Sequence, residues 1–194
     1  IYTEVPELIS HVHLPVQSGS NNILKAMRRR HTRDEYIETI NKLKEIRPGI
    51  SISSDFIVGF PGESEEDFQD TLDLTDEVEY DESFSFIYSP RPNTTAKDLE
   101  DSVTPQEKKE RLDRLQAKLE QSALSISRRM VGRVSNSLVT GVSKKDPGEF
   151  QARTENNKVV IFSCDDQSLI GNFVPVEIVE AKTKSLRGIY RPEC

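Results

Sequence analysis

The residues best suited to ligand binding lie in one stretch, residues 53–63, with the sequence S-S-D-F-I-V-G-F-P-G-E. Small polar residues precede an apolar run, which a turn containing Gly59 and Gly62 follows. Glycines let the backbone approach a ligand closely, and the N-terminus of a following helix favours negative charge. We therefore expect a ligand crevice at the end of the apolar strand. Glu63 has two equal interpretations, a ligand contact or a first-turn acid that stabilises the helix dipole.

Two further groups of residues could bind ligands. His11 and His13 would share one strand face, as in a metal site, but no third ligand has suitable spacing, and a hydrogen-bonded histidine is commoner. A basic run could contact phosphate, although a solvated helix end is favoured. The run comprises Arg28, Arg29, Arg30, His31 and Arg33.

The elements that must position these residues alternate between strand and helix. In order, the patterns predict a strand over residues 11–16, a helix over 22–29, a helix from the Thr32–Glu35 capping box to Pro48, a strand over 50–58, a helix over 65–78 and a strand over 82–88. Such alternation predicts a parallel sheet backed by helices, with ligands at the carboxyl ends of the strands. With only three strands, the sheet is small or incomplete.

Residues 89–101 are irregular and should lie on the same functional face, because they follow a strand end. Arg91, flanked by prolines, either contacts a ligand there or forms a surface salt bridge. Thr104, Pro105 and Glu107 then begin a long helix that should end near Gly132.

After residue 133 the pattern changes to short strands. They are predicted at residues 134–142, 150–154, 158–162, 173–181 and 188–190, which indicates a small antiparallel barrel of OB-like type. Such barrels often bind nucleic acid. Phe150, Phe162 and Phe173 are expected in its core, so stacking residues are scarce. The polar candidates for RNA contact are Arg153, Asn156, Asn157, Lys158, Lys182, Lys184 and Arg187.

Composition limits the class of protein. The 194 residues carry a net charge of −7, and the acidity lies in residues 1–128, with 16 basic and 25 acidic side chains. Residues 129–194 carry 10 basic and 8 acidic side chains, so nucleic-acid binding there is not excluded. Two distant cysteines, Cys164 and Cys194, indicate neither a disulfide framework nor a zinc site.

No membrane span and no secretory signal are visible, so we expect a soluble cytoplasmic protein. The chain lacks an initiating Met, so we expect it to be a piece of a longer protein. An incomplete sheet would also leave an open strand edge near residues 11–16.

Four motifs together resemble the radical-SAM methylthiotransferases, and among them the MiaB type that modifies tRNA. They are H-L-P-V-Q-S-G-S (residues 13–20), S-S-D-F-I-V-G-F-P-G-E (53–63), S-F-I-Y-S-P-R-P-N-T (85–94) and R-T-E-N-N-K-V-V (153–160), in the order and spacing of that family. The resemblance covers nearly the whole chain.

The resemblance implies an α/β plus all-β fold. Residues 1–128 would form the C-terminal half of a radical-SAM partial (β/α) barrel with a long linking helix, and residues 129–194 a TRAM β-barrel for RNA. The implied reaction is methylthiolation at C2 of N6-isopentenyladenosine, next to the anticodon. S-adenosylmethionine would supply the methyl group and the 5′-deoxyadenosyl radical. The implied partners are a tRNA anticodon stem-loop and the N-terminal part of the parent enzyme.

The sequence departs from the family at the cluster. The C-x-x-x-C-x-x-C that holds a radical-generating [4Fe-4S] cluster is absent, so this piece has no catalytic or metal-binding residue of that kind and should be inactive alone. Two rivals stay open: a sister enzyme acting on a ribosomal protein or on threonylcarbamoyl-adenosine, and a non-catalytic RNA-binding module.

By the same resemblance, eight residues are assigned to a partial S-adenosylmethionine site. Four of them, Phe56, Ile57, Val58 and Gly59, offer backbone and apolar contacts to the adenine. The polar candidates are Gln17, Ser18, Ser54 and Asp55. Arg91, Arg153, Asn156, Asn157, Lys158, Lys184 and Arg187 are assigned to RNA.

Overall fold

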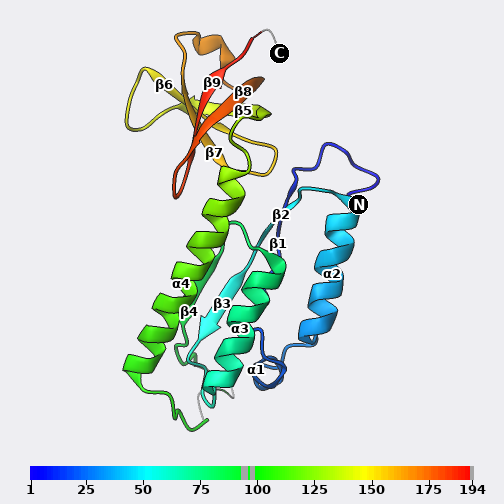
Figure 1. The fold of residues 1–194 in the computed structure, drawn as a ribbon, viewed down its shortest axis with the longest axis vertical. Helices are drawn as coiled ribbons and strands as arrows, with labels where there is room; N and C mark the ends of the chain where they lie inside the picture. The colour runs from blue at the N-terminus through cyan, green and yellow to red at the C-terminus, as the bar shows by residue number, and fades with distance from the viewer. Residues whose placement is uncertain (93–95, 97–98, 193–194) are drawn as a thin grey trace. The chain divides into compact units, whose positions relative to one another are not determined.

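A computed structural model describes residues 1–92, 96 and 99–192. The chain divides into two compact units. The sheet unit comprises Val12–Pro48 and Ile52–Ser122, and the barrel unit comprises Ile1–His11, Gly49–Ser51 and Ala123–Cys194. Figure 1 shows the elements of each unit.

Short strands form the sheet: β1 (His11–His13), β2 (Ser51–Ser53), β3 (Asp55–Val58) and β4 (Phe84–Ile87). β1 pairs with β2, β3 pairs in parallel with β4, and a parallel bridge joins Gln17 to Phe56. The expected parallel pairing is thus confirmed for β3 and β4.

The predicted strand over residues 50–58 is divided at Ser54. Its hydroxyl donates to the Leu14 carbonyl (2.9 Å) and accepts from the Val16 amide (3.0 Å). Backbone bonds flank them, from the Leu14 amide to the Ser53 carbonyl and from the Gln17 amide to the Asp55 carbonyl, each 2.9 Å, and β1 ends at His13, earlier than predicted. A small hydroxyl residue therefore joins two neighbouring segments where the strands are irregular.

Helices α1 (Asn21–Ala26), α2 (Arg33–Ile46), α3 (Glu65–Val78) and α4 (Pro105–Arg128) follow the capping signals of the sequence. Thr32 and Ser64 form capping boxes at α2 and α3, so the predicted starts of both helices are confirmed. α1 ends earlier than predicted, and Arg28 behind it has a positive φ of 58°.

Three helices lie side by side against the sheet (Figure 1). The Lys44 ammonium of α2 donates to the Val78 carbonyl of α3 (2.9 Å), and Lys118 of α4 pairs with an acidic residue of α3. Phe56 of β3 packs edge-on against Tyr80, with ring centroids 5.1 Å apart, and both side chains are fully buried. One sheet face is therefore covered by helices.

The segment between β1 and α1 is bound tightly to α3. A Cβ at Gly19 would lie 2.3 Å from the Asp70 carbonyl oxygen, so only glycine permits this approach. Asp67 joins the two helix starts: its Oδ1 accepts from the Ser20 hydroxyl (2.5 Å), and its Oδ2 accepts from the Ser64 amide (3.0 Å) and hydroxyl (2.8 Å). The N-caps of α1 and α3 thus share one carboxylate.

The barrel unit contains a closed five-stranded barrel in the order β5-β6-β7-β9-β8, which confirms the predicted barrel. Its strands are β5 (Val134–Val142), β6 (Glu149–Arg153), β7 (Val159–Ser163), β8 (Phe173–Ala181) and β9 (Leu186–Tyr190), with a short 3₁₀ helix, η2 (Gln167–Leu169). Only β7 and β9 pair in parallel.

The barrel core is built as expected, with one exception. Phe150 and Phe162 are buried, but the expectation that Phe173 belongs to the core is wrong, because that side chain is 64% exposed. Phe173 begins β8, whose inward positions start at Val174. Alternate residues of a strand face opposite sides, and the hydrophobic pattern did not show which set of β8 residues faces the core.

Gly19→Ala should destabilise the sheet unit. Relieving a 2.3 Å contact with helix backbone requires a backbone shift, and we expect a loss of about 1–3 kcal/mol in the free energy of unfolding. Urea unfolding followed by helical circular dichroism measures it. Gly148→Ala, where the nearest atom is a side-chain oxygen at 3.4 Å, is the matched control and should change stability by less than about 0.5 kcal/mol. Equal effects would refute the close approach.

Acidification should remove the stabilisation that Asp67 provides. Burial acts to raise the pKa of this carboxyl, but the hydrogen bonds from Ser20, Ser64 and Asn22 hold it below its ordinary value of 3.8. A lowered folded-state pKa contributes stability above the unfolded-state pKa and loses it as pH falls through the folded-state pKa. The stability difference between the unsubstituted chain and Asp67→Asn should therefore shrink as pH falls from about 5 to about 3.

Urea unfolding at both pH values tests this, with Glu66→Gln, at an exposed position of the same helix turn, as control. A difference for Asp67→Asn that stays constant or grows on acidification would contradict the assignment.

Candidate functional site

The turn after β3 is held by both neighbouring elements. The Val58 carbonyl accepts from the Tyr88 amide (2.9 Å), and the Gly59 amide donates to Oε2 of Glu63 (2.7 Å). The peptide unit between Val58 and Gly59 is therefore bound at both of its polar groups. Gly59 then adopts φ +68°, which glycine tolerates without strain.

Glu63 lies before the N-cap of α3, so it is not a first-turn residue. Its side chain is 1% exposed and pairs with Arg111 of α4, whose Nη1 donates to Glu63 Oε2 and to the Glu63 carbonyl, each at 2.9 Å. Burial raises the pKa of the Glu63 carboxyl above its ordinary value, although the bonds from Gly59 and Arg111 act in the opposite direction. The carboxylate is a structural centre of the turn.

Lys108 covers the other side of the same turn. A Cβ at Gly59 would lie 2.3 Å from Lys108 Cγ, so the helix occupies the space that the glycine leaves. The Lys108 ammonium pairs with Asp101 (2.5 Å) and lies 6.0 Å from the Tyr88 ring centroid. Sequence reasoning missed Lys108 and Arg111. The signal was available, because both precede Leu115 and Leu119 at helical spacing on the buried stripe of α4.

The sheet face that the helices leave uncovered carries the ligand-accessible side chains. Asp55 and Ile57 of β3 are partly exposed and lie in register with Phe84 and Phe86 of β4, which are each 54% exposed. His13 of β1 lies beside them, with Nε2 3.5 Å from Asp55 Oδ2. This group of five residues is called the open face below.

Of the eight residues assigned to the cofactor, four have side chains that face the protein interior. Ser18 approaches Thr71 at 3.3 Å, Ser54 bonds to the segment before it, and Phe56 and Val58 are fully buried. These four have only backbone to offer a ligand.

Of the other four, Asp55 and Ile57 are partly exposed, whereas Gln17 (8% exposed) and Gly59 are buried. Gln17, with φ +78°, bridges to β3, while Asp55, Ile57 and the backbone of Gly59 follow one another along that strand. A carboxylate beside an apolar side chain on one sheet face suits an adenosyl group, whose hydroxyls need acceptors and whose base needs apolar contact. The residues present therefore fit part of S-adenosylmethionine.

An iron-sulfur cluster does not fit the described residues. Within residues 1–92, 96 and 99–192, no group of three or more His, Cys, Asp or Glu side chains could hold a metal ion. His13 has Asp55 and Ser53 as its neighbours, Nδ1 lying 3.0 Å from the Ser53 hydroxyl, and makes no metal site with His11.

The basic run over residues 28–33 is largely exposed to solvent. Arg28, Arg29 and Arg30 are exposed in the connection between α1 and α2. Arg33 pairs with Glu77 (3.2 Å) and lies 3.9 Å from an Asp70 carboxylate oxygen, both on α3.

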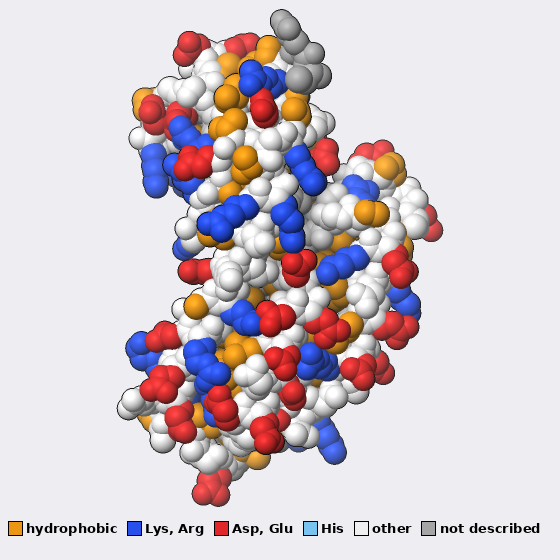
Figure 2. Space-filling model, in the orientation of Figure 1, with side chains coloured by type: hydrophobic (Ala, Val, Ile, Leu, Met, Phe, Trp, Pro, Cys, Tyr) orange, Lys and Arg blue, Asp and Glu red, His pale blue; other side chains and the backbone are white. Residues whose placement is uncertain are grey.

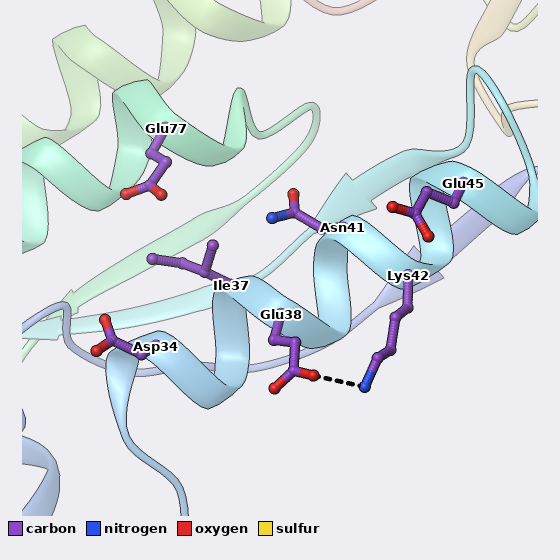
Figure 3. Close-up of a pocket in the computed structure, with 7 residues that line it drawn as sticks. All are labelled: Asp34, Ile37, Glu38, Asn41, Lys42, Glu45 and Glu77. Atoms are coloured by element: carbon purple, nitrogen blue, oxygen red, sulfur yellow. Dashed lines mark hydrogen bonds and ion pairs between the residues drawn. The ribbon is translucent and has the colours of Figure 1, made fainter.

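One pocket of about 440 Å³ lies along the outer side of α2 (Figure 3). Its lining is mainly acidic: Asp34, Ile37, Glu38, Asn41, Lys42 and Glu45 of α2, with Glu77 of α3. A surface ion pair between Lys42 and Glu38 (2.7 Å) crosses its edge. The pocket does not include any residue of the open face.

Arg91 lies exposed in the connection after β4. Part of that connection, residues 93–95 and 97–98, lies outside the described residues, and so does part of the motif over residues 85–94.

In the barrel unit, three connections meet at one end of the barrel. β7 and β9 are parallel neighbours, so the turns that precede them, residues 154–158 and 182–185, lie at the same end. The Asn156 amide contacts Met130 Sδ (3.6 Å), which adds the connection from α4 to β5. We call residues 129–133, 154–158 and 182–185 the basic end. Lys and Arg side chains also gather on the face of the barrel seen in Figure 2.

The basic end brings together several of the residues predicted to bind RNA. Lys158 and Lys184 lie there, and Arg129 and Arg133, which sequence reasoning missed, join them from the α4–β5 connection. A cluster of Arg at the end of the long helix was the available signal.

Arg153, Asn157 and Arg187 form bonds within the barrel unit that the structure shows. Arg153 donates to the Asn157 carbonyl (2.8 Å), and Asn157 has φ +65°, a conformation that asparagine tolerates in turns. Arg187 forms a two-bond ion pair with Glu149 on the outer barrel face, and this pairing lowers the pKa of the Glu149 carboxyl. To bind a phosphate group of RNA, Arg187 would have to break its ion pair with Glu149.

No helix in the described part of the chain is long and apolar enough to cross a membrane.

Comparison with known proteins gave two family matches in different parts of the chain. Residues 3–75 match the Radical SAM superfamily, and residues 128–190 match the TRAM domain. The chain is 57% identical over 188 residues to the tRNA-2-methylthio-N(6)-dimethylallyladenosine synthase of Hahella chejuensis, covering 97% of this chain and 42% of that protein. It is 58% identical over 187 residues to the enzyme of that name from Pseudomonas syringae pv. syringae, covering 96% and 42%.

The chain thus spans about two fifths of the length of these relatives. A radical SAM match and a TRAM match therefore occur in one chain, and relatives of one name align with nearly all of it.

Proposed function

We propose that this chain is part of an enzyme that methylthiolates C2 of N6-dimethylallyladenosine, the isopentenyl form of adenosine, next to the tRNA anticodon. The observation that carries the proposal is the 57% identity to a synthase of that name over 97% of the chain. The rest of such an enzyme would be supplied by sequence outside this chain, because the chain spans 42% of that relative.

In this proposal, the carboxyl end of β3 forms one wall of an S-adenosylmethionine site. Asp55 would accept hydrogen bonds from the cofactor's hydroxyl or ammonium groups, Ile57 would contact the adenine, and the Gly59 turn would shape the end of the site. Gln17 would border it from the neighbouring segment. When bound, the cofactor supplies a methyl group and a source of radical chemistry. The chain's residues bind and orient it.

The [4Fe-4S] clusters of the proposed enzyme would be held outside this chain, since thiolates at defined spacing are needed and this sequence has two cysteines, 30 positions apart. We therefore propose that the chain alone is inactive. We also propose a division at residue 128 into a radical-SAM part and a TRAM part, and a cytoplasmic location, where tRNA is available.

The basic end of the barrel would contact the phosphate backbone of tRNA. Phosphate contacts by Lys and Arg position nucleic acid and make binding depend on salt. Lys158, Lys184, Arg129 and Arg133 are placed for this role, while Arg153 and Asn157 would maintain the turn between β6 and β7.

A second candidate function is a non-catalytic RNA-binding module. It is favoured by the closed barrel with its basic end, together with the absence of cluster cysteines from this sequence. Sister enzymes acting on a ribosomal protein or on threonylcarbamoyl-adenosine are the alternatives within the family.

Nucleoside analysis tests the reaction. In a strain that lacks the gene encoding this chain, digested tRNA should lose 2-methylthio-N6-dimethylallyladenosine and accumulate N6-dimethylallyladenosine. Liquid chromatography with mass spectrometry detects both. An unchanged 2-methylthio peak would refute the proposed substrate, and loss of the threonylcarbamoyl derivative instead would identify a sister enzyme.

RNA binding by the basic end should depend on its cations. Fluorescence anisotropy with a labelled anticodon stem-loop measures the dissociation constant of the 194-residue chain at several salt concentrations. Arg133→Ala with Lys184→Ala should weaken binding by about tenfold and reduce the salt slope by about 2.

Lys145→Ala is the matched control, because Lys145 lies in the β5–β6 connection, at the opposite end of β6 from Arg153. An equal loss for Lys145→Ala would indicate general electrostatic attraction and contradict a defined site.

A further inference from the structure

We propose that Glu63 and Arg111 are positioning residues for cofactor binding, which act by fixing the Gly59 peptide at the end of β3. This inference rests on the proposed function of that strand end. Neither residue belongs to the open face, and the pair acts through the backbone between them and the site.

The Glu63 side chain extends across the turn to the Gly59 amide. One oxygen, Oε2, accepts both the Gly59 amide (2.7 Å) and Arg111 Nη1 (2.9 Å), so the carboxylate connects the strand end to α4. The Glu63 amide also donates to the Phe60 carbonyl (2.9 Å), which closes the turn. A side chain of this length is needed, because the bond to Gly59 spans the whole turn.

Arg111 is held in place by contacts with three residues of the turn and of α3. Its Nη1 binds Glu63 twice, its Nε lies 3.5 Å from a Glu65 carboxylate oxygen, and its guanidinium carbon lies 5.7 Å from the Phe68 ring centroid. A planar guanidinium with fixed donor directions suits such a site better than the single ammonium of lysine. α4 thereby holds Glu63 in one rotamer.

The Glu63–Arg111 pair contributes more to the geometry of the turn than to stability. A buried ion pair is a poor source of stability, because desolvation of both charges offsets their attraction, and well-packed apolar pairs are often as good. What an apolar pair would not provide is an acceptor for the Gly59 amide. The Tyr88 amide binds the carbonyl of the Val58–Gly59 peptide. The Glu63–Arg111 pair binds its amide, and this second contact is what an apolar pair could not supply.

Two variants of Glu63 separate length from charge. Glu63→Gln keeps the length and an acceptor oxygen but removes the charge. Glu63→Asp keeps the charge but is one methylene shorter, so it cannot reach Gly59 while remaining at Arg111. Positioning predicts that Gln preserves the site and Asp disrupts it, whereas a charge-based role predicts the reverse.

The experiment is a titration of the ¹⁵N-labelled 194-residue chain with S-adenosylmethionine, followed by the amide resonances of residues 55–59. We expect the dissociation constant of Glu63→Gln to stay within about twofold of the unsubstituted chain and that of Glu63→Asp to rise about tenfold. Gly59 amide exchange without ligand should be fast only in Glu63→Asp. Unchanged resonances of buried sheet-unit residues away from the turn, for example the Ile40 amide, establish folding.

The outcomes are distinct. If the unsubstituted chain binds and both variants bind equally, or if Gln binds worse than Asp, positioning by Glu63 is refuted. If the unsubstituted chain gives no shifts, the proposed cofactor wall fails, and the role of the pair fails with it. Should Glu63→Asp not fold, Arg111→Lys replaces it: weakened binding with slowly exchanging amides in α2 and α3 of the sheet unit supports the proposal, and unchanged binding overturns it.

Discussion

One buried carboxylate fixes the turn on which the open face ends. Glu63 is almost fully removed from water, and a buried charge must be paired and hydrogen-bonded to be tolerated. Its partners come from the strand end at Gly59 and from Arg111 of α4, two segments far apart in the sequence. The turn, the strand before it and the first turns of α4 are therefore held together by this group. The open face owes its shape at this end to the same contacts.

Regular elements with clear periodicity were predictable from the sequence. The capping boxes at Thr32 and Ser64 fixed the starts of α2 and α3, and alternation located all five barrel strands within a few residues. Prediction failed where tertiary contacts override local pattern. Ser54 divides a strand by bonding to its neighbour, and Phe173 is exposed because the inward phase of β8 begins one residue later.

The sequence indicated where along the chain the candidate site lies, but not which side chains are exposed there. The apolar run over residues 56–58 indicated a strand end, but period two sends Phe56 and Val58 under the helices and leaves Asp55 and Ile57 on the open face. The sequence of this run does not indicate which of its alternating side chains face the helices. Lys108 and Arg111 escaped prediction because charged residues are expected at the surface, whereas here they bury their stems and pair their charges.

Phe84 and Phe86 have a thermodynamic consequence. Both rings are more than half exposed on a sheet face, so water hydrates aromatic surface that most folded chains would cover. Hydration of apolar surface carries a large positive heat capacity, and its removal gives a negative heat-capacity change. Any molecule that covers this face should therefore bind with an enthalpy that becomes more favourable as temperature rises. Calorimetry at several temperatures would distinguish such an occupant from one that binds only the cations of the barrel.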